Sequence, residues 1–438
     1  MRILLISPCY PHRKARYCPE LNPGIVAPPL GLAYIASAIQ HLNIQIKVVD
    51  MVLEDWRPED ITHVLNEFRP DIVGISCNMA FVSQSAIAVS KEVNRHNPDT
   101  VIIMGGNHAT FCHADIIRSC PEIDYIVLGE GEIPFAELIV ALQNGEPTQQ
   151  IPGIVSKGKD GKIIVNQQKH RVINLDSLRN PARHLLQIDR YGPDSRGILI
   201  GSRGCPYSCA YCSTSAFSGK RIRMHSVDRV VDEMQNLSNK YSINHLIFVD
   251  DTFTINKKRV YLICEKILQK SIKVTWACDT RVDLVDRPLL EQMYKAGCRS
   301  IFFGIESANQ EALDMVGKKF YVEQAYRACV LAREVGIQVQ QSFIVGLPGE
   351  DINSIEKIID FVQYTRPNRV LLNFFIVYPG TPSDINPSDY GIVSTSEEWG
   401  KSEGAHPMVT TLKMTPDQVR RAYVKLALGL HEIGMPQW

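Results

Sequence analysis

The sequence lacks long hydrophobic runs and a dominant charge. No apolar stretch among the 438 residues approaches the roughly 18 that a membrane-spanning helix needs, so no membrane span is predicted. The 47 Lys and Arg residues are balanced by 47 Asp and Glu residues, and no nucleic-acid or anionic-membrane partner is expected from net charge. The opening MRILLISPCY has no small-residue cleavage pattern. It predicts a first strand rather than a leader, and a cytoplasmic protein.

A dinucleotide fingerprint is also missing, since no GxGxxG follows the first apolar run. A nicotinamide or flavin dinucleotide is therefore a poor expectation for this part of the chain. Residues 1–145 instead alternate apolar runs with segments of helical spacing. The runs cover residues 2–7, 44–50, 71–77, 100–106 and 125–131. This alternation predicts an α/β domain with a doubly wound, Rossmann-like parallel sheet.

Small and polar residues follow several of these runs. In a parallel sheet, ligands bind beyond the carboxyl ends of the strands, and small residues allow close backbone approach. The candidate binding residues at these ends are Pro8, Ser76, Cys77, Asn78, Gly105, Gly106, His108, Gly129 and Glu130. The alternative is that they only turn the chain, and this alternative is favoured unless the rest of the sequence supplies a ligand.

The remainder of the chain falls into three parts. Residues 146–195 are polar and proline-bearing, and they predict a linker with a β-hairpin over 153–166 that turns at Asp160-Gly161. Residues 196–385 contain six further strand-helix units, which favour a partial (β/α)6 barrel, although periodicity alone does not exclude a second open sheet. Residues 386–438 predict a short tail that is helical from about Thr415.

Three of the twelve cysteines lie in one short loop, GCPYSCAYC, directly after the first strand of the second domain. They are Cys205, Cys209 and Cys212, and no fourth cysteine lies nearby. A structural zinc site needs four ligands, whereas thiolates are the ordinary ligands of iron-sulfur clusters. A 4Fe-4S cluster held by three thiolates leaves one iron open to a small molecule. An accidental group of core cysteines is disfavoured because the intervening residues form a loop.

This loop, with Tyr211 directly before Cys212, resembles the Cys-x3-Cys-x2-Cys signature of the radical S-adenosylmethionine (SAM) enzymes. The resemblance implies that SAM chelates the open iron. It further implies that one electron cleaves SAM to methionine and a 5′-deoxyadenosyl radical, which removes hydrogen from an unactivated carbon. An electron donor such as flavodoxin or ferredoxin is an implied partner.

The resemblance extends to later strand ends, in VDDTFTINKKR, CDTRVDLVD, FGIES and SFIVGLPGE. It implies that Glu306 meets the ribose or amino group of SAM, that Arg281 meets its carboxylate and that the turn at Gly346 passes the adenine. Asp250 is a further cofactor-binding candidate. Each residue has an ordinary alternative: a salt bridge at the barrel mouth for Glu306 and Arg281, a helix cap for Asp250 and a simple turn for Gly346.

The first domain, with APPLGLAYIASAI, MGGNHATF and YIVLGEGEIPF, is similar to the cobalamin-binding domain of cobalamin-dependent radical SAM enzymes. Cobalamin is thus an implied second cofactor, lined by the loop glycines and Ser76, Cys77 and Asn78. The chain has no Asp-x-His-x-x-Gly motif, so no histidine is expected on the lower face of the cobalt. His108 is expected to bond a corrin amide or to cap the next helix.

The resemblance implies methylation of an unactivated carbon of a small-molecule substrate, with SAM and cobalamin as cofactors. One alternative is a non-methylating radical SAM dehydratase, cyclase or rearrangement enzyme whose first domain need not carry cobalamin. A non-catalytic cobalamin-binding or redox-sensing protein fits less well, because such a protein would not require the catalytic combination of the Cys205 loop, Arg281 and Glu306. No motif names the substrate.

Overall fold

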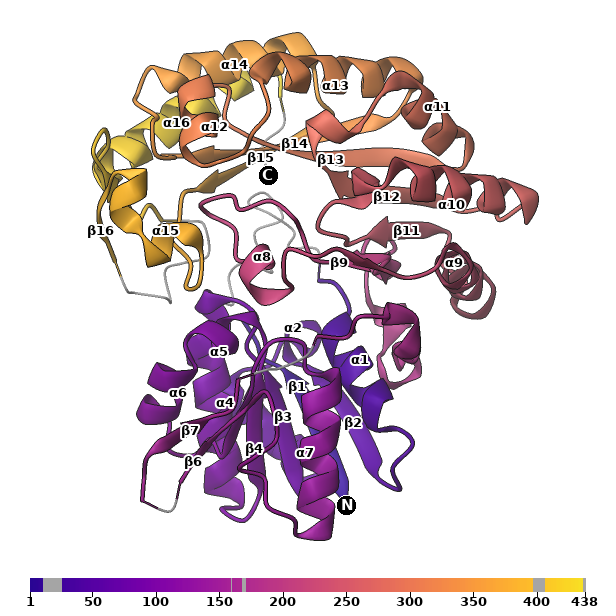
Figure 1. Cartoon of the computed structure of the whole chain (residues 1–438), viewed down its shortest axis with the longest axis vertical. Helices are drawn as coiled ribbons and strands as arrows, with labels where there is room; N and C mark the ends of the chain where they lie inside the picture. Colours follow the sequence, from indigo (N-terminus) through magenta and orange to yellow (C-terminus); the bar gives the residue numbers. More distant parts are fainter. Residues whose placement is uncertain (11–25, 159, 168–170, 397–405, 436–438) are drawn as a thin grey trace. The chain divides into compact units, whose positions relative to one another are not determined.

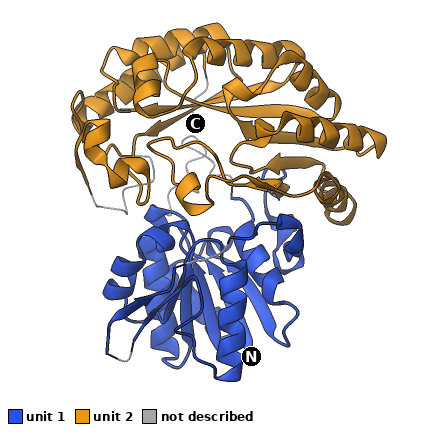
Figure 2. Ribbon diagram, viewed as in Figure 1, with its two compact units in different colours: residues 1–19, 23–196 blue, residues 20–22, 197–438 orange. Residues whose placement is uncertain are grey.

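The computed structural model describes residues 1–10, 26–158, 160–167, 171–396 and 406–435. Within these residues the chain forms two compact units, one extending to Arg196 and the other beginning at Gly197 (Figure 2). No described helix is long and apolar enough to cross a membrane.

The first unit is built on a sheet of seven strands in the order β2-β1-β3-β4-β5-β6-β7 (Figure 1). Its five parallel strands are β1 (Arg2–Ser7), β2 (Gln45–Asp50), β3 (Ile72–Ser76), β4 (Val101–Gly105) and β5 (Tyr125–Val127). All five lie within the predicted runs, although β5 ends four residues early. The order reverses between β1 and β3, and this reversal is where ligands bind in open α/β sheets.

Helices bury both faces of the parallel strands. Ile3 and Leu5 pack on one side of β1, and Leu4 and Ile6 pack on the other, so the strand reads as a continuous apolar run. One face is covered by α1 (Leu30–Ile39) and α7 (Glu132–Asn144). The other is covered by α3 (Thr62–Phe68), α4 (Ser83–His96) and α6 (His113–Ser119). The short helices α2 (Met51–Glu54) and α5 (Asn107–Phe111) follow β2 and β4.

The predicted hairpin belongs to this sheet. Strands β6 (Ile154–Lys157) and β7 (Ile163–Val165) pair antiparallel with each other, and β6 pairs antiparallel with β5. An uncovered edge strand presents a row of backbone donors and acceptors, which an added hairpin satisfies. The segment that the sequence marks as a linker therefore extends the sheet, which is mixed rather than wholly parallel.

The second unit is a partial barrel of six parallel strands that follow one another in chain order. They are β8 (Ile198–Leu199), β11 (His245–Phe248), β12 (Thr275–Thr280), β13 (Cys298–Glu306), β14 (Gln338–Val345) and β15 (Arg369–Phe374). Among the described residues β8 and β15 form the two ends of the sheet. The open-sheet alternative is thus replaced by an arched sheet with helices outside it (Figure 1).

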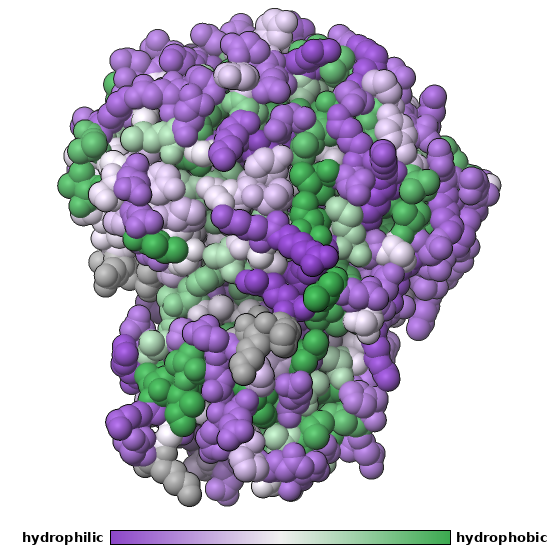
Figure 3. Space-filling model, viewed as in Figure 1, coloured by the Kyte–Doolittle hydropathy of each residue, from purple (hydrophilic) through white to green (hydrophobic). Residues whose placement is uncertain are grey.

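The helical layer of the second unit comprises α9 (Val227–Tyr241), α10 (Lys257–Gln269), α11 (Arg287–Lys295), α12 (Gln310–Met315), α13 (Val322–Val335) and α14 (Ser354–Thr365). Its outer surface is mostly hydrophilic (Figure 3). The C-terminal part contains α15 (Pro382–Ile385), a ladder of β16 (Ile392–Thr395) and β17 (Val409–Thr411), and α16 (Pro416–Glu432). Helix α16 begins where predicted, because Thr415 caps it and Gln418 completes a capping box.

Candidate functional site

The cysteine loop is tied closed at its base. Strands β9 (Ser202–Arg203) and β10 (Arg223–Met224) pair antiparallel on either side of it, and the amide of Cys205 donates to the carbonyl of Gly219 at 3.2 Å. Gly204 has a φ of 95°, and a Cβ there would lie 2.7 Å from the carbonyl oxygen of Arg221. Glycine is therefore required where the loop begins. The loop also contains the short helix α8 (Thr214–Phe217).

The three predicted cysteines lie in one loop of the structure. Cys209 is buried, and Cys205 and Cys212 are partly buried. Burial raises the pKa of the Cys205 and Cys212 thiols, and the neighbouring thiols raise both pKa values further. Among the described residues, no three His, Cys, Asp or Glu side chains converge on a position for a single metal ion.

Tyr211 and Glu306 meet through Lys318. The Lys318 ammonium donates to Glu306 Oε1 at 2.8 Å and to the Tyr211 hydroxyl at 2.9 Å. Ser342 donates to the other Glu306 oxygen at 3.2 Å. The Glu306 carboxylate thus forms a salt bridge at the barrel mouth, which is the alternative to SAM binding considered for it from the sequence. One of its oxygens accepts a hydrogen bond from Lys318 and the other accepts one from Ser342.

Arg281 is buried beside the cysteine loop. Its guanidinium forms two hydrogen bonds with the Asp283 carboxylate, at 3.0 and 3.1 Å, and donates to the carbonyl of Lys318 at 2.7 Å. It also stacks on the ring of Tyr207, 3.7 Å from the ring centroid. Arg281 therefore links the end of β12 to the cysteine loop, and its assignment to the SAM carboxylate stays a prediction.

Asp250 lies behind the cysteine loop, 1% exposed. One carboxylate oxygen accepts from the amide of Gly201 and the other from the Ser202 hydroxyl, both at 2.6 Å. Burial raises the pKa of Asp250 to about 6, against the lowering effect of these hydrogen bonds and of Arg259. The helix-cap alternative does not hold, since Asp250 bonds the segment that leads into Cys205.

Gly346 turns the chain after β14 with a φ of 86°. The carboxylate of Glu350 accepts from the amides of Gly346 and Leu347 at 3.0 and 3.3 Å, and from the Ser307 hydroxyl at 2.6 Å. Glu350 is 1% exposed, and burial raises its pKa to about 7. The turn is thereby fastened to the residue that follows Glu306.

In the first unit, the candidate loops after β3 and β4 are bonded to each other. The amide of Cys77 donates to the carbonyl of Gly105 at 2.7 Å, and the amide of Ala109 donates to the carbonyl of Cys77 at 3.2 Å. Gly106 has a φ of 114°, and a Cβ there would lie 2.4 Å from Asn78 Oδ1. The two loops therefore pack closely at this edge, with the Asn78 side chain beside Gly106.

The remaining candidates of the first unit lie at the same ends. Pro8 follows β1, Ser76 is the last residue of β3, and Gly129 and Glu130 follow β5. The amide of Gly129 donates to the Thr110 hydroxyl at 2.9 Å, which joins the β5 loop to α5.

His108 lies inside α5 and is 6% exposed. Gly106, not His108, occupies the N-cap position of this helix, so the capping role is wrong. Burial lowers the pKa of His108 to about 4, which keeps the ring neutral at physiological pH. Its bond to a corrin amide stays a prediction.

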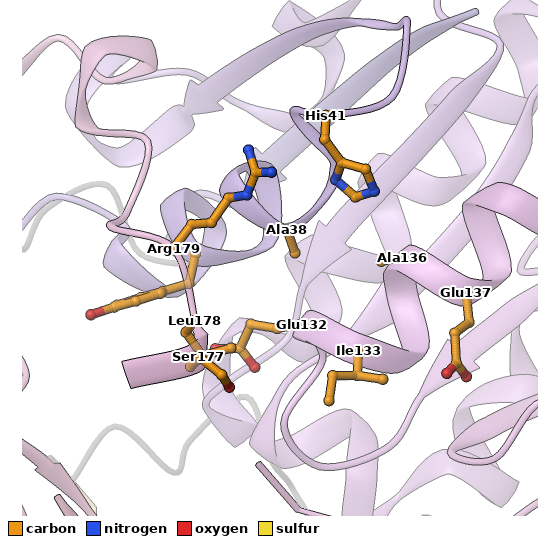
Figure 4. Close-up of a pocket in the computed structure, with 10 residues that line it drawn as sticks. Ala38, His41, Glu132, Ile133, Ala136, Glu137, Ser177, Leu178 and Arg179 are labelled. Carbon is orange, nitrogen blue, oxygen red and sulfur yellow. The ribbon is translucent and has the colours of Figure 1, made fainter. Parts of the chain in front are cut away.

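A separate pocket of about 310 Å³ lies beside α1 and α7 (Figure 4). Its lining includes His41, Glu132, Ile133 and Arg179. None of the candidate loop residues lines it, so it has no part in the site described above.

Comparison with known proteins matches each of the two units to a domain family. The radical SAM superfamily model matches residues 199–362 and the B12-binding domain model matches residues 21–139. A Pyrococcus horikoshii protein named as an uncharacterized methyltransferase is 34% identical over 437 residues, covering 98% of this chain and 93% of that protein. An anaerobic magnesium-protoporphyrin IX monomethyl ester cyclase of Rubrivivax gelatinosus is 30% identical over 397 residues, covering 88% of this chain and 69% of that protein.

The chain belongs to the cobalamin-dependent radical SAM enzymes. Two solved members share its fold. TsrM from Kitasatospora setae, with cobalamin and a 4Fe-4S cluster bound, has a TM-score of 0.75 at 17% identity and covers 99% of this chain and 88% of its own. OxsB with aqua-cobalamin bound has a TM-score of 0.74 at 18% identity and covers 97% of this chain and 66% of its own.

The cofactors of this radical SAM enzyme are a 4Fe-4S cluster, SAM and cobalamin, and its residues fit them. The cysteine loop offers three neighbouring thiols and no fourth, which suits a cluster with one iron open to SAM. The strand ends of the first unit offer small residues and backbone groups, and the Cβ positions of Gly105 and Gly106 face Val127 and the Cys77-Asn78 segment, so these glycines let neighbouring loops pack closely. These observations fit the predicted sites.

Two residues of this radical SAM site escaped the sequence analysis. Lys318 lies twelve residues after Glu306, and Glu350 lies four after Gly346. Both are charged residues near a glycine, a common arrangement in exposed turns, so no local pattern separates them from solvated charges. Only their burial, 6% exposed for Lys318 and 1% for Glu350, reveals that they belong to the site.

Proposed function

We propose that this enzyme transfers a methyl group to an unactivated carbon of a small-molecule substrate. The observation that carries the proposal is the nearly full-length similarity to a protein named as a methyltransferase, together with a complete three-cysteine loop. Neither the radical SAM unit nor the B12-binding unit is truncated in that alignment, so a chemistry that uses both cofactors is supported.

Separate groups of residues would bind the cluster, cobalamin and SAM. Cys205, Cys209 and Cys212 would hold the cluster, and the strand-end loops of the first unit would hold cobalamin. When bound, the cluster supplies the electron that cleaves SAM, and cobalamin carries the methyl group. Glu306 would accept hydrogen bonds from SAM, and its contacts with Lys318 and Ser342 hold the carboxylate in one orientation.

Arg281 would add a positive charge beside the cysteine loop, suited to a carboxylate. The Gly346-Leu347 turn follows the end of β14 with the Val419 side chain packed against Gly346, and Glu350 holds the turn rigid. The cluster must be reduced before each SAM cleavage, so we include a low-potential flavodoxin or ferredoxin among the partners.

The test uses SAM that carries a deuterated methyl group, a strong reductant and metabolite extract as the source of substrate. We expect S-adenosylhomocysteine and 5′-deoxyadenosine to form together and the label to appear in an extract metabolite. A product formed without S-adenosylhomocysteine would end the methyl-transfer proposal. Cys209→Ser should abolish SAM cleavage, whereas Ser208→Ala, exposed in the same loop, should retain it.

A second candidate function is ring formation without methyl transfer, which the similarity to a protein named as a cyclase supports. It predicts 5′-deoxyadenosine without S-adenosylhomocysteine and no deuterium in the product. The same incubation therefore separates the two functions.

A further inference from the structure

The six-stranded sheet of the second unit has two different faces. Helices pack on its outer face (Figure 1). Along β11, β12 and β15, buried side chains on that face alternate with partly or fully exposed side chains on the other, which we call the inner face. From β11 to β15, its members include Ile247, Ala277, Asp279, Phe302, Gln340 and Leu371. Side chains on the inner face are therefore open to a ligand.

Asp279 places a carboxylate in the middle of the inner face. It is exposed, and its strand β12 lies between β11 and β13. Within the described residues no hydrogen bond or ion pair involves its carboxylate. Protein surrounds this group without covering it, and the resulting desolvation raises the pKa of Asp279 to about 7, with the Asp250 carboxylate as a second cause. An accessible carboxylate that the fold itself does not pair is a candidate for binding a ligand.

The neighbours of Asp279 favour a cation on an apolar skeleton. Val249 follows β11 and lies level with Asp279 by the register that pairs Phe248 with Cys278, and its side chain is 44% exposed. On the other side, Phe302 is the register partner of Asp279 on β13. A partly desolvated carboxylate and an aromatic ring both attract a cation, whereas a neutral donor would gain only an ordinary hydrogen bond.

The inner face continues to Glu306, the residue predicted to contact SAM. Gly304 lies two residues beyond Phe302 on the same face, and a Cβ there would lie 2.5 Å from Glu306 Oε1. Ser342, the register partner of Gly304, donates to Glu306 Oε2 at 3.2 Å. With about 3.3 Å per residue and about 4.8 Å between strands, Asp279 is about 8 Å from Gly304. A cation bound at Asp279 would thus bring carbons a few bonds away to the vicinity of Glu306.

We propose that Asp279 recognises the substrate through an ion pair with a protonated amine, so that the substrate of this enzyme is an amine with an apolar carbon skeleton. The proposal rests on the proposed function for the reaction itself and adds the substrate class. Asp279 acts here as a binding residue, and no bond-making step is assigned to it.

The first experiment measures binding and does not depend on methyl transfer. Isothermal titration calorimetry follows benzylamine binding to the reconstituted holoenzyme, with SAM bound and no reductant present. Benzyl alcohol has the same skeleton without the charge. The natural enzyme should bind benzylamine about tenfold more tightly than benzyl alcohol, the gain expected of a charge-assisted hydrogen bond.

Variants assign this preference to one carboxylate. Asp279→Asn should bind benzylamine about tenfold more weakly than the natural enzyme and benzyl alcohol equally well. Asp360→Asn, at an exposed aspartate of α14, is the matched control and should bind both compounds as the natural enzyme does. Equal benzylamine affinity in Asp279→Asn and the natural enzyme would overturn the inference. If Asp279→Asn fails to fold, the natural enzyme decides alone, because equal affinity for the two compounds would also overturn the inference.

The second experiment examines the deuterium-labelled metabolite from the extract incubation. The labelled product should be retained by a cation-exchange resin at pH 7, and acetylation of its amine should abolish the retention. A labelled product that passes through the resin untreated would overturn the inference and leave methyl transfer intact. If no metabolite is labelled, the proposed methyl transfer fails, and the benzylamine comparison still decides whether Asp279 binds amines.

Discussion

Removal of the Asp250 carboxylate should destabilise the second unit strongly. Its oxygens accept from Gly201 and Ser202 at 2.6 Å, and hydrogen bonds to a charged group contribute about 1.5–3 kcal/mol each. Arg259, 7% exposed, donates to the carbonyls of Gly201 and His225 and would lose its nearby negative charge. Leaving one partner of a buried charge pair uncompensated costs about 3–5 kcal/mol.

These contributions overlap, so Asp250→Ala should lower the free energy of unfolding by about 3–5 kcal/mol in total. Ser202→Ala removes a single hydrogen bond and should cost about 1 kcal/mol. Urea unfolding of the metal-free protein, followed by tryptophan fluorescence, measures both. Trp276 reports on this unit because it is fully buried and packs edge-on against Phe248.

The iron content supplies a second measurement. Gly201 and Ser202 lead directly into the cysteine loop, so Asp250→Ala should also reduce iron per chain after reconstitution. If Asp250→Ala unfolds within about 1 kcal/mol of the natural protein and changes only the affinity for SAM, the positional role is refuted and Asp250 faces the cofactor.

Two further predictions concern the first unit. Its free energy of unfolding should fall as the pH drops from 6.5 to 4, by at most about 1.4 kcal/mol per pH unit through His108. The buried ring has a pKa of about 4, so His108 takes up a proton at a higher pH in the unfolded chain than in the folded protein. His108→Gln should flatten this part of the stability curve in urea titrations, and an unchanged slope would contradict the assignment. Gly106→Ala should destabilise this unit by about 2–4 kcal/mol through backbone strain and overlap with Asn78. Gly145→Ala also has a positive φ but nothing within 4 Å, so equal losses in the two variants would disprove the overlap.

Much of the fold was predictable because its signals are local. The apolar runs placed the strands of both units, and the capping box at Thr415 placed the start of α16. The hairpin over 153–166 was also predictable, but its partner was not. Which edge a hairpin joins depends on where β5 presents open backbone groups, and no residue within the hairpin encodes that.

The residues of the candidate site likewise fall into those that local sequence indicates and those that only packing reveals. Three cysteines in one loop and glycines at strand ends follow from their own sequence, because a cluster ligand set and a tight turn are both short-range requirements. The sequence also marked Glu306 and Arg281, but not the partners that hold them.

Only the tertiary structure decided those partnerships. Lys318 meets Tyr211 across 107 positions of the chain, and Asp250 bonds Ser202 across 48. Such contacts arise where parallel strands end at one rim and their loops converge, so the identity of each partner depends on strand register and on the shift beside Glu306. Local sequence determined which residues can perform the chemistry, and packing between distant segments determined which charges are buried beside them.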